Sequence, residues 1–336
     1  MELYCAIDLH SNNNVAVIID QEDKILFQRR LPNDLGTVLC ALEPYKGKLF
    51  GVAVESTFNW YWLVDGLSDA GYRALLVNTA KVKQYSGLKH TDDEDDAFWL
   101  AHLMRLGILP TGYIYPREQR AIRDLLRKRA QLVRHRTIHV LSIQNQYCRN
   151  TGGKLKADFI KRSDEYLGEV GDENIRLAME SNHRVIRALD EQIKQIECRV
   201  KKQVKLRPEY ELLLTVDGIG DILGLTIMLE TGDIGRFKEV GHYASYCRCV
   251  DSQYRSNDKK KGEGNEKNGN KYLAWAFIEA ANFAKRFNER ARRFYQRKAA
   301  KRNNVVATKA LAHKLARACY YIIRDQVPFD ENKVFV

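Results

Sequence analysis

Acidic residues at three places in the first third of the chain could together hold a divalent metal ion. Asp8 closes one expected strand, Glu55 closes another, and an acidic run at 92–96 opens an expected helix. Asp93 and Asp96 share one face of that helix, because residues three apart are neighbours there. Carboxylates held close together repel one another, and a cation bound by their oxygens removes the repulsion. Two such ions could stabilise the attacking and leaving oxygens of a phosphoryl transfer.

The acidic run also has a simpler explanation. Carboxylates near a helix N-terminus accept hydrogen bonds from its free N–H groups and interact favourably with the helix dipole. Taken alone, the run is better explained in this way, and Asp92 and Asp95 offer the same i,i+3 spacing as the pair chosen above. The convergence of three separate acidic positions on one edge of the same expected sheet favours the metal site.

The elements that must position these acids follow from the hydrophobic pattern. Alternating apolar residues and short polar breaks predict strands at 2–9, 13–20, 24–31, 49–55 and 73–78, with helices at 34–45, 58–70 and 93–106. This order predicts an α/β domain with a mixed sheet, which begins as an antiparallel meander, continues through crossovers and has helices on both faces. The first and fourth strands can be neighbours, which would bring Asp8 and Glu55 together.

The pattern changes after Pro116. Long helices are expected at 118–149 and 172–205, joined by a loop-like stretch at 150–171. In the second helix, apolar residues step by three and four at Ile186, Leu189, Ile193, Ile196 and Val200. This heptad seam indicates an antiparallel helical arm or a coiled-coil dimer contact. A mostly helical unit follows from 209, with a polar, glycine-bearing loop at 251–271. The expected domains are 1–110, 117–206 and 209–326.

Charge is divided unevenly along the 336 residues, whose net charge is +12. Residues 1–110 carry 10 Lys and Arg against 15 Asp and Glu, whereas the remainder carries 45 against 28. An acidic front suits divalent cations and a basic back suits a polyphosphate partner, although a basic surface can also serve solubility alone. No apolar run is long enough for a membrane span, and no secretory signal is expected. The seven scattered cysteines suit a reduced cytoplasmic protein.

The basic character is strongest at 285–317, where 12 Lys and Arg face the single acid Glu289. Four arginines recur at helical spacing with Phe287, Phe294 and Tyr295 interleaved. Such a surface could follow a nucleic-acid backbone and stack on exposed bases. A solvated basic face is the alternative, but the near absence of compensating acids makes it less attractive.

Three acidic motifs resemble those of the DEDD transposases of insertion sequences: Ala6-Ile7-Asp8, Val54-Glu55-Ser56 and Asp93-x-x-Asp96-Ala97-x-x-Leu100-Ala101. The resemblance implies an N-terminal RuvC-like, RNase H-type domain. It also implies that Asp8, Glu55, Asp93 and Asp96 form a metal-binding tetrad for Mg²⁺, with Mn²⁺ as a substitute.

The C-terminal third resembles the second signature of the same family. Leu214-Thr215-Val216-Asp217-Gly218-Ile219-Gly220 is similar to the start of its transposase domain, and Gly269-Asn270-x-x-Leu273 to its Gly-Asn-x-x-Leu helix start. By that match Ser256 is the implied nucleophile, with Ser252 as a rival. Asn257 follows Ser256 where the family usually has Gly, and Asn tolerates a left-handed backbone better than most residues.

Basic residues near the serine and along the last third are the expected nucleic-acid contacts. Those close to the serine could screen phosphate charge. The full set is Arg255, Lys259, Lys260, Lys261, Lys267, Lys271, Arg286, Arg290, Arg293 and Arg297.

The resemblance implies a DNA recombinase that moves an insertion sequence through a covalent serine–DNA intermediate. A structured noncoding bridge RNA of the element would select donor and target DNA. Homodimers would pair into a tetramer in the prokaryotic cytoplasm, associated with the nucleoid, so acidic and serine motifs could come from different subunits. Two alternatives stay open: a RuvC-like, metal-dependent junction endonuclease that uses water, and an inactive relic that only binds DNA or RNA.

Overall fold

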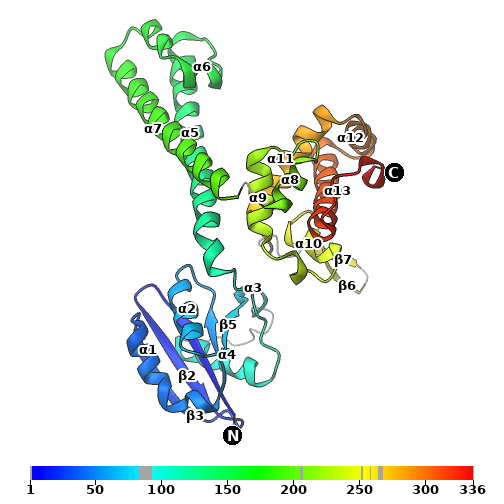
Figure 1. The fold of residues 1–336 in the computed structure, drawn as a ribbon. Helices are drawn as coiled ribbons and strands as arrows, with labels where there is room; N and C mark the ends of the chain where they lie inside the picture. The colour runs from blue at the N-terminus through cyan, green and yellow to red at the C-terminus, as the bar shows by residue number, and fades with distance from the viewer. Residues whose placement is uncertain are drawn as a thin grey trace. The chain divides into compact units, whose positions relative to one another are not determined.

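The computed structural model describes residues 2–82, 93–204, 207–250, 253–257, 259–263 and 268–335. The chain forms two compact units, residues 1–117 and 118–336 (Figure 1). The boundary lies at the first turn of α5 (Arg117–Thr151). The expected three-part division, with the arm as a domain of its own, stays a prediction.

The N-terminal unit is built on a five-stranded mixed sheet with the order β3-β2-β1-β4-β5. Its strands are β1 (Leu3–Leu9), β2 (Asn13–Ile19), β3 (Ile25–Pro32), β4 (Leu49–Glu55) and β5 (Ala74–Val77). The first three strands pair antiparallel, whereas β4 runs parallel to both β1 and β5. The predicted α/β class, the meander, the crossovers and the neighbouring first and fourth strands are therefore confirmed.

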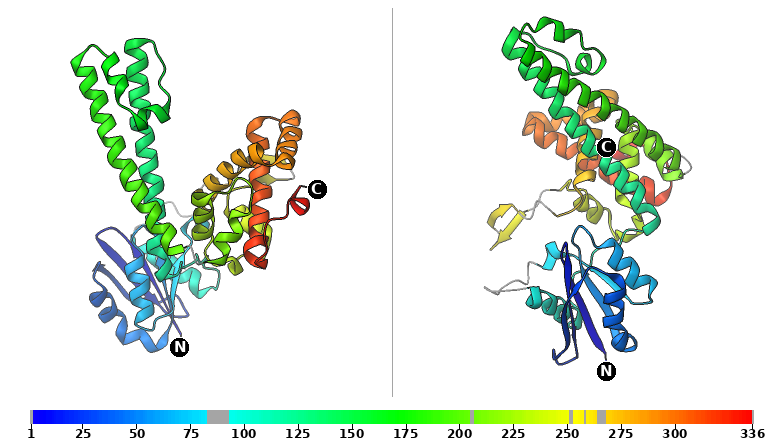
Figure 2. Two further views of the ribbon diagram at one scale, coloured as in Figure 1. Left: turned by 45° about the horizontal axis from the view of Figure 1, so that its top comes forward. Right: turned by 90° about the vertical axis from the view of Figure 1, so that its left-hand side faces the viewer.

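Helices cover both faces of this sheet. On β1, Cys5 and Ile7 pack with α1 (Leu35–Leu42) and α2 (Tyr61–Asp69), whereas Tyr4 and Ala6 face α4 (Asp93–Arg105). The right-hand view of Figure 2 shows α4 on the opposite side of the strands from α2. The first helix ends earlier than expected, because Glu43–Lys48 forms a 3-10 segment, η1, with Pro44 near its start. The short helix α3 (Thr79–Val82) follows β5.

Two long helices form an antiparallel arm in the second unit, α5 and α7 (Glu173–Val204), which lie side by side in both views of Figure 2. Ile186, Ile193 and Val200 are buried at seven-residue intervals, so the predicted seam packs within one chain. Arg136 pairs with Asp190 across the two helices.

The expected loop at 150–171 is wrong in part. It contains α6 (Ala157–Arg162) and the 3-10 helix η3 (Glu165–Glu169), which bury Ile160 and Tyr166 at the end of the arm. The buried Tyr166 hydroxyl also pairs with His183 Nδ1 at 2.8 Å. This small apolar cluster allows short helices to form in a polar connection.

The rest of the second unit is mostly helical, as expected. It contains α8 (Pro208–Leu214), α9 (Asp221–Thr231), η4 (Ile234–Arg236), α10 (Val240–Tyr246), α11 (Lys271–Phe287), α12 (Glu289–Lys301), α13 (Asn304–Asp325) and α14 (Glu331–Val334). Leu126, Val200 and Val204 at the base of the arm share its hydrophobic core. Gly218 has a φ of 97°, and a Cβ there would lie 2.5 Å from Ala280 O. The turn at 214–220 thus needs glycine to pack on α11.

The glycine-bearing segment at 251–271 is not simply a loop. It contains the antiparallel hairpin of β6 (Gln253–Ser256) and β7 (Lys259–Glu263). All seven cysteines are free. In the part of the chain described, no helix combines the length and apolar character that a membrane span requires.

Candidate functional site

Asp8 and Glu55 meet at one edge of the N-terminal sheet. Ile7 pairs with Val54 in the parallel β1–β4 register, so the acids that follow them leave the two strands side by side. Alternation along each strand places both acids on the face covered by α4, because Ala6 and Ala53 pack there. The Asp8 side chain is only 4% exposed. The expected approach of these two acids is therefore present in the fold.

The environment of Glu55 disfavours its negative charge. Burial raises the pKa of Glu55 most, followed by a hydrogen bond to Asp8 and by the negative charges of Asp8 and Asp96, and together they bring it to about 8. Acidic side chains from β1 and α4 thus act on Glu55, at the end of β4.

The first turn of α4 brings the third acid to this edge. Ala97, Leu100 and Ala101 bury one face of α4 against the sheet, and Asp96 directly precedes that buried face. Asp95 and Asp96 are both exposed, and the negative charge of Asp96 is one of the causes of the raised pKa of Glu55. The backbone of Asp93 begins the helix, but its side chain lies outside the described part, as does the whole of Asp92.

The donor chemistry of this edge fits a divalent cation. Carboxylate oxygens are hard ligands, and a divalent cation bound beside Asp8 and Glu55 would offset the repulsion that raises the pKa of Glu55. Among the side chains that the structure describes, no three acidic, histidine or cysteine residues are arranged as a complete metal site. Asp93, the remaining expected ligand, is not among those side chains.

His10 is a neighbour of the acidic site that the sequence reasoning missed. Its Nε2 lies 3.1 Å from Asp8 Oδ2. Its carbonyl accepts hydrogen bonds from Asn33 Nδ2 and Asn59 Nδ2, both at 3.0 Å. The turn after β1 is therefore anchored to the segments that follow β3 and β4. The position of His10, two residues beyond Asp8, was the available signal.

The far end of α4 is fixed to the β2–β3 turn. Asp23 accepts hydrogen bonds from Arg105 Nε and Nη2, both at 2.6 Å, and its Oδ1 lies 2.9 Å from His102 Nδ1. Burial alone would raise the pKa of Asp23, but the hydrogen bonds from His102 and Arg105 hold it below its usual value. This cluster joins the C-terminal end of α4 to the β2–β3 turn, and the other end of the same helix carries Asp96.

Ser256 ends β6 in the second unit, opposite Lys259 in the hairpin register. Asn257 has a left-handed φ of 56°, as expected for the residue that replaces glycine there. The side chains of Ser256, Arg255 and Lys260 lie outside the described part, and so does the whole of Ser252 and Lys267. The hairpin places the serine at a tight turn among lysines.

The basic residues fall on several elements rather than on one helix. Lys259 and Lys261 are exposed on β7, and Lys271 is exposed at the start of α11. The four arginines divide at Asn288, which caps α12 through a hydrogen bond from Ala291 N at 2.8 Å, so Arg286 belongs to α11 and the others to α12.

The aromatic residues beside these arginines are only partly available. Phe287 is 72% exposed, but Phe294 is buried and Tyr295 is half-buried beneath Lys285. Arg290 and Arg293 also form ion pairs with Glu331 and Glu289. Only Phe287 of the three aromatics offers an open face for base stacking.

Comparison with known families finds a match in each of two parts of the chain. Residues 5–146 match the family model of the IS110-type DEDD transposases, described as "Transposase". Residues 210–296 match the model described as "Transposase IS116/IS110/IS902 family". The chain belongs to the IS110 family of DEDD transposases. The first IS110 match covers the acidic sheet and the start of the arm, and the second covers the serine hairpin and α11.

One curated relative of this IS110 chain is "Putative transposase y4qE" from Sinorhizobium fredii (strain NBRC 101917 / NGR234). The two are 22% identical over 221 residues, which cover 66% of this chain. The match spans 55% of the length of that relative.

Proposed function

We propose that this protein is a transposase that cuts and rejoins DNA at the ends of an insertion sequence, using a divalent metal ion and a covalent serine–DNA intermediate. The observation that supports this proposal most is that Asp8 and Glu55 meet at the sheet edge covered by α4. Asp96 lies close enough to affect the pKa of Glu55. Family membership and the basic second unit support DNA as the substrate.

Asp8, Glu55, Asp93 and Asp96 would hold the metal ion, which is Mg²⁺ in this proposal with Mn²⁺ as a substitute. When bound, the ion would neutralise charge on the scissile phosphate and on the leaving oxygen. Burial of Asp8 and anchoring of His10 would keep the ligands fixed as charge develops.

Ser256 would supply the nucleophile. Its oxygen would bond to phosphorus as the bond to one DNA end breaks, and the serine proton would finish on the leaving hydroxyl. Attack by another DNA hydroxyl would reverse the exchange, free the serine and join the strands without an external energy source. Arg255, Lys259, Lys260 and Lys261 would screen the phosphates around the turn.

A bridge RNA transcribed from the element would select both DNA sites, and two homodimers would pair so that acids and serine act on the same bond. Lys267, Lys271 and the arginines of α11 and α12 are the proposed contacts for these nucleic acids. The excess of basic residues in the second part of the chain supports this assignment.

The test is cleavage of plasmid DNA that carries the element with its flanks, in the presence of RNA transcribed from the element. Ser256→Ala is expected to abolish the protein–DNA adduct on denaturing gels, and Asp8→Ala to abolish all cleavage. Ser252→Ala is the matched control and should retain the adduct. Cleavage by Ser256→Ala without an adduct would indicate water as nucleophile, and undiminished recombination by Asp8→Ala would refute the proposal.

A further inference from the structure

The segment that carries the serine hairpin begins and ends at neighbouring points of the C-terminal unit. Asn270 N donates to Tyr246 O, at the end of α10, over 2.6 Å. Arg248 Nη2, just after α10, donates to the Gly269 carbonyl over 3.0 Å. The described residues on either side of the hairpin, 246–248 and 269–270, are therefore joined to each other, and this base limits where β6 and β7 can lie.

Asn270 is the central residue of this base and is 8% exposed. Its Oδ1 caps α11 by accepting hydrogen bonds from the N–H groups of Tyr272 and Leu273, at 2.8 and 3.2 Å. Its Nδ2 donates to Glu230 Oε2 over 2.7 Å. One amide side chain thus joins the start of α11 to the last turn of α9.

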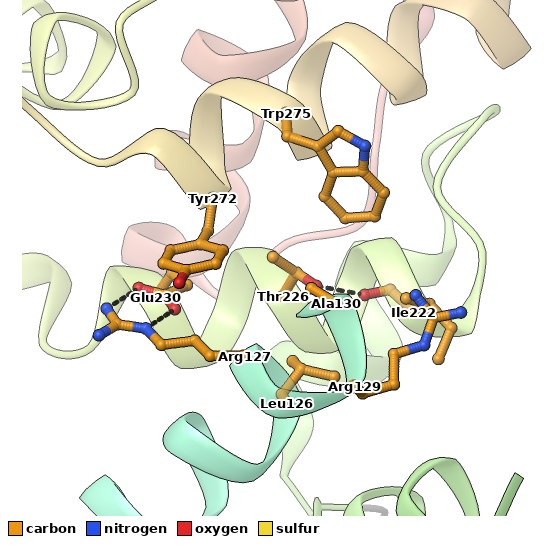
Figure 3. Close-up of a pocket in the computed structure, with 9 residues that line it drawn as sticks. All are labelled: Leu126, Arg127, Arg129, Ala130, Ile222, Thr226, Glu230, Tyr272 and Trp275. Carbon is orange, nitrogen blue, oxygen red and sulfur yellow. Dashed lines mark hydrogen bonds and ion pairs between the residues drawn. The ribbon is translucent and has the colours of Figure 1, made fainter. Parts of the chain in front are cut away.

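Glu230 connects the same base to the helical arm. Its carboxylate, 3% exposed, accepts hydrogen bonds from Arg127 Nε and Nη2 of α5, at 2.6 and 2.7 Å (Figure 3). The Arg127 guanidinium also lies 4.8 Å from the centre of the Tyr272 ring. These residues line a pocket between α5, α9 and α11.

The placement of this carboxylate is costly unless its partners are present. A buried negative charge loses its hydration, and the C-terminal end of a helix carries a partial negative charge of its own. The bidentate arginine and the Asn270 amide offset both costs. A residue needed only for packing at this position would be apolar, so the charge indicates that the geometry of the junction matters.

We propose that Glu230 is a positioning residue for the serine reaction, which fixes the base of the serine hairpin against the base of the helical arm. This inference rests on the proposed function, because it assumes that Ser256 attacks DNA. A movement of α5 relative to α9 would shift Arg127, and through Glu230 and Asn270 it would shift the hairpin base. A misplacement of about 1 Å can cost about 100-fold in rate.

The main experiment uses Glu230→Gln in the full-length protein, with the plasmid and element RNA described above. At saturating DNA, adduct formation in a single turnover is expected to slow by about 10- to 100-fold. The Kd for DNA should stay within about threefold, because the described partners of Glu230, Arg127 and Asn270, are not among the expected nucleic-acid contacts. Hydrogen exchange should quicken at the amides of 271–273, whose cap Glu230 supports.

Asn270→Ser supplies a second variant, because serine retains a capping oxygen but loses the amide that donates to Glu230. It leaves the Arg127–Glu230 pair intact, so it decides the question if Glu230→Gln fails to fold. Asp190→Asn is the matched control, since it breaks an ion pair to Arg136 within the arm, and its cleavage rate should equal that of the wild type.

Adduct formation within twofold of wild type in both Glu230→Gln and Asn270→Ser would overturn the inference. An equal loss in Asp190→Asn would also overturn it, because the effect would then reflect the arm in general. Ser256→Ala in the same assay distinguishes a failure of the Glu230 inference from a failure of the proposed serine chemistry. If Ser256→Ala still forms the adduct, the assignment of Ser256 as the nucleophile in the proposed function is wrong.

Discussion

The sheet edge with Asp8 and Glu55 and the hairpin with Ser256 differ in how the chain holds them. The two acids leave adjacent strands at the centre of a five-stranded sheet, with buried residues on both faces. Ser256 ends a short strand of a two-stranded hairpin, and the described anchors of its segment lie at 246–248 and 269–270. The acids are therefore positioned by a continuous core, whereas the described anchors of the serine segment are hydrogen bonds at its base.

The largest expected effect comes from Glu55 at the sheet edge, where one substitution should lower activity but raise stability. Glu55→Gln should lower cleavage by at least about 1,000-fold, because a metal ligand is lost. The same change should raise the melting temperature of the metal-free protein by a few degrees at pH 8, since it removes a charge that the folded state disfavours. Cleavage gels and calorimetry on one preparation measure both quantities. A variant that loses stability and activity together would argue for a structural role.

A substitution at the base of the serine hairpin should lower the stability of the protein, whereas Glu55→Gln at the sheet edge should raise it. Gly269 has a φ of 88°, and a Cβ there would lie 2.5 Å from the Tyr246 carbonyl oxygen. Gly269→Ala is therefore expected to cost about 2 to 4 kcal/mol of unfolding free energy in the second unit. Hydrogen exchange should quicken in α10 and α11 but not in β1 and β4.

Gly262→Ala is the matched control for this prediction. Gly262 lies on β7 of the same hairpin segment, and a Cβ there would meet nothing within 4 Å. It should change the unfolding free energy by less than about 0.5 kcal/mol. Equal effects at the two glycines would contradict the view that the hairpin is held mainly at its base.

The sequence predicted the sheet edge well because short-range patterns determine it. Alternation identified each strand, and the order of strands and helices made β1 and β4 parallel neighbours, so Asp8 and Glu55 had to leave together. The identity of the third acid was less determined, because Asp92 and Asp95 have the same spacing as Asp93 and Asp96.

The base of the hairpin could not be predicted in the same way. Arg127 of α5, Glu230 of α9 and Asn270, which precedes α11, are far apart in the sequence, and none of them belongs to a periodic pattern. The hairpin strands were also missed, because Lys259-Lys260-Lys261-Gly262-Glu263 shows no alternation of apolar and polar residues. The break at Asn288 did have a signal, an asparagine followed by an acid, which is typical of a helix start.

A divalent cation should stabilise the sheet edge more as the pH rises. The pKa of Glu55 lies above its usual value in the folded protein, so the folded state holds a proton that the unfolded state releases first. Stability of the metal-free protein should therefore fall as the pH rises from about 5 to about 8. Mn²⁺ should raise the melting temperature by a few degrees at pH 8 and by less at pH 6.

The control for the metal effect is Glu55→Gln, in which the dependence on Mn²⁺ and on pH should both be smaller. Thermal unfolding in Mn²⁺ and in a chelator, at the two pH values, measures the difference. A metal effect that is the same at both pH values, or unchanged in Glu55→Gln, would place the cation elsewhere on the protein.

The smallest expected effect concerns the cluster that fixes the far end of α4. Asp23→Asn should cost about 1 to 2 kcal/mol at pH 7, because Arg105 loses a charged, bidentate partner that is partly buried. The pKa of Asp23 is depressed in the folded state, so its contribution should be present above the unfolded value near 4 and lost as the pH falls below it. Urea unfolding of wild type and variant at pH 7 and pH 3 tests this. The difference in unfolding free energy between wild type and Asp23→Asn should shrink at pH 3. Asp69→Asn is the control, because it removes an exposed partner of Arg117 and should cost under about 1 kcal/mol. A difference that persists at pH 3 would mean that the Asp23 charge does not hold α4, and the position of Asp96 would then depend on sheet packing alone.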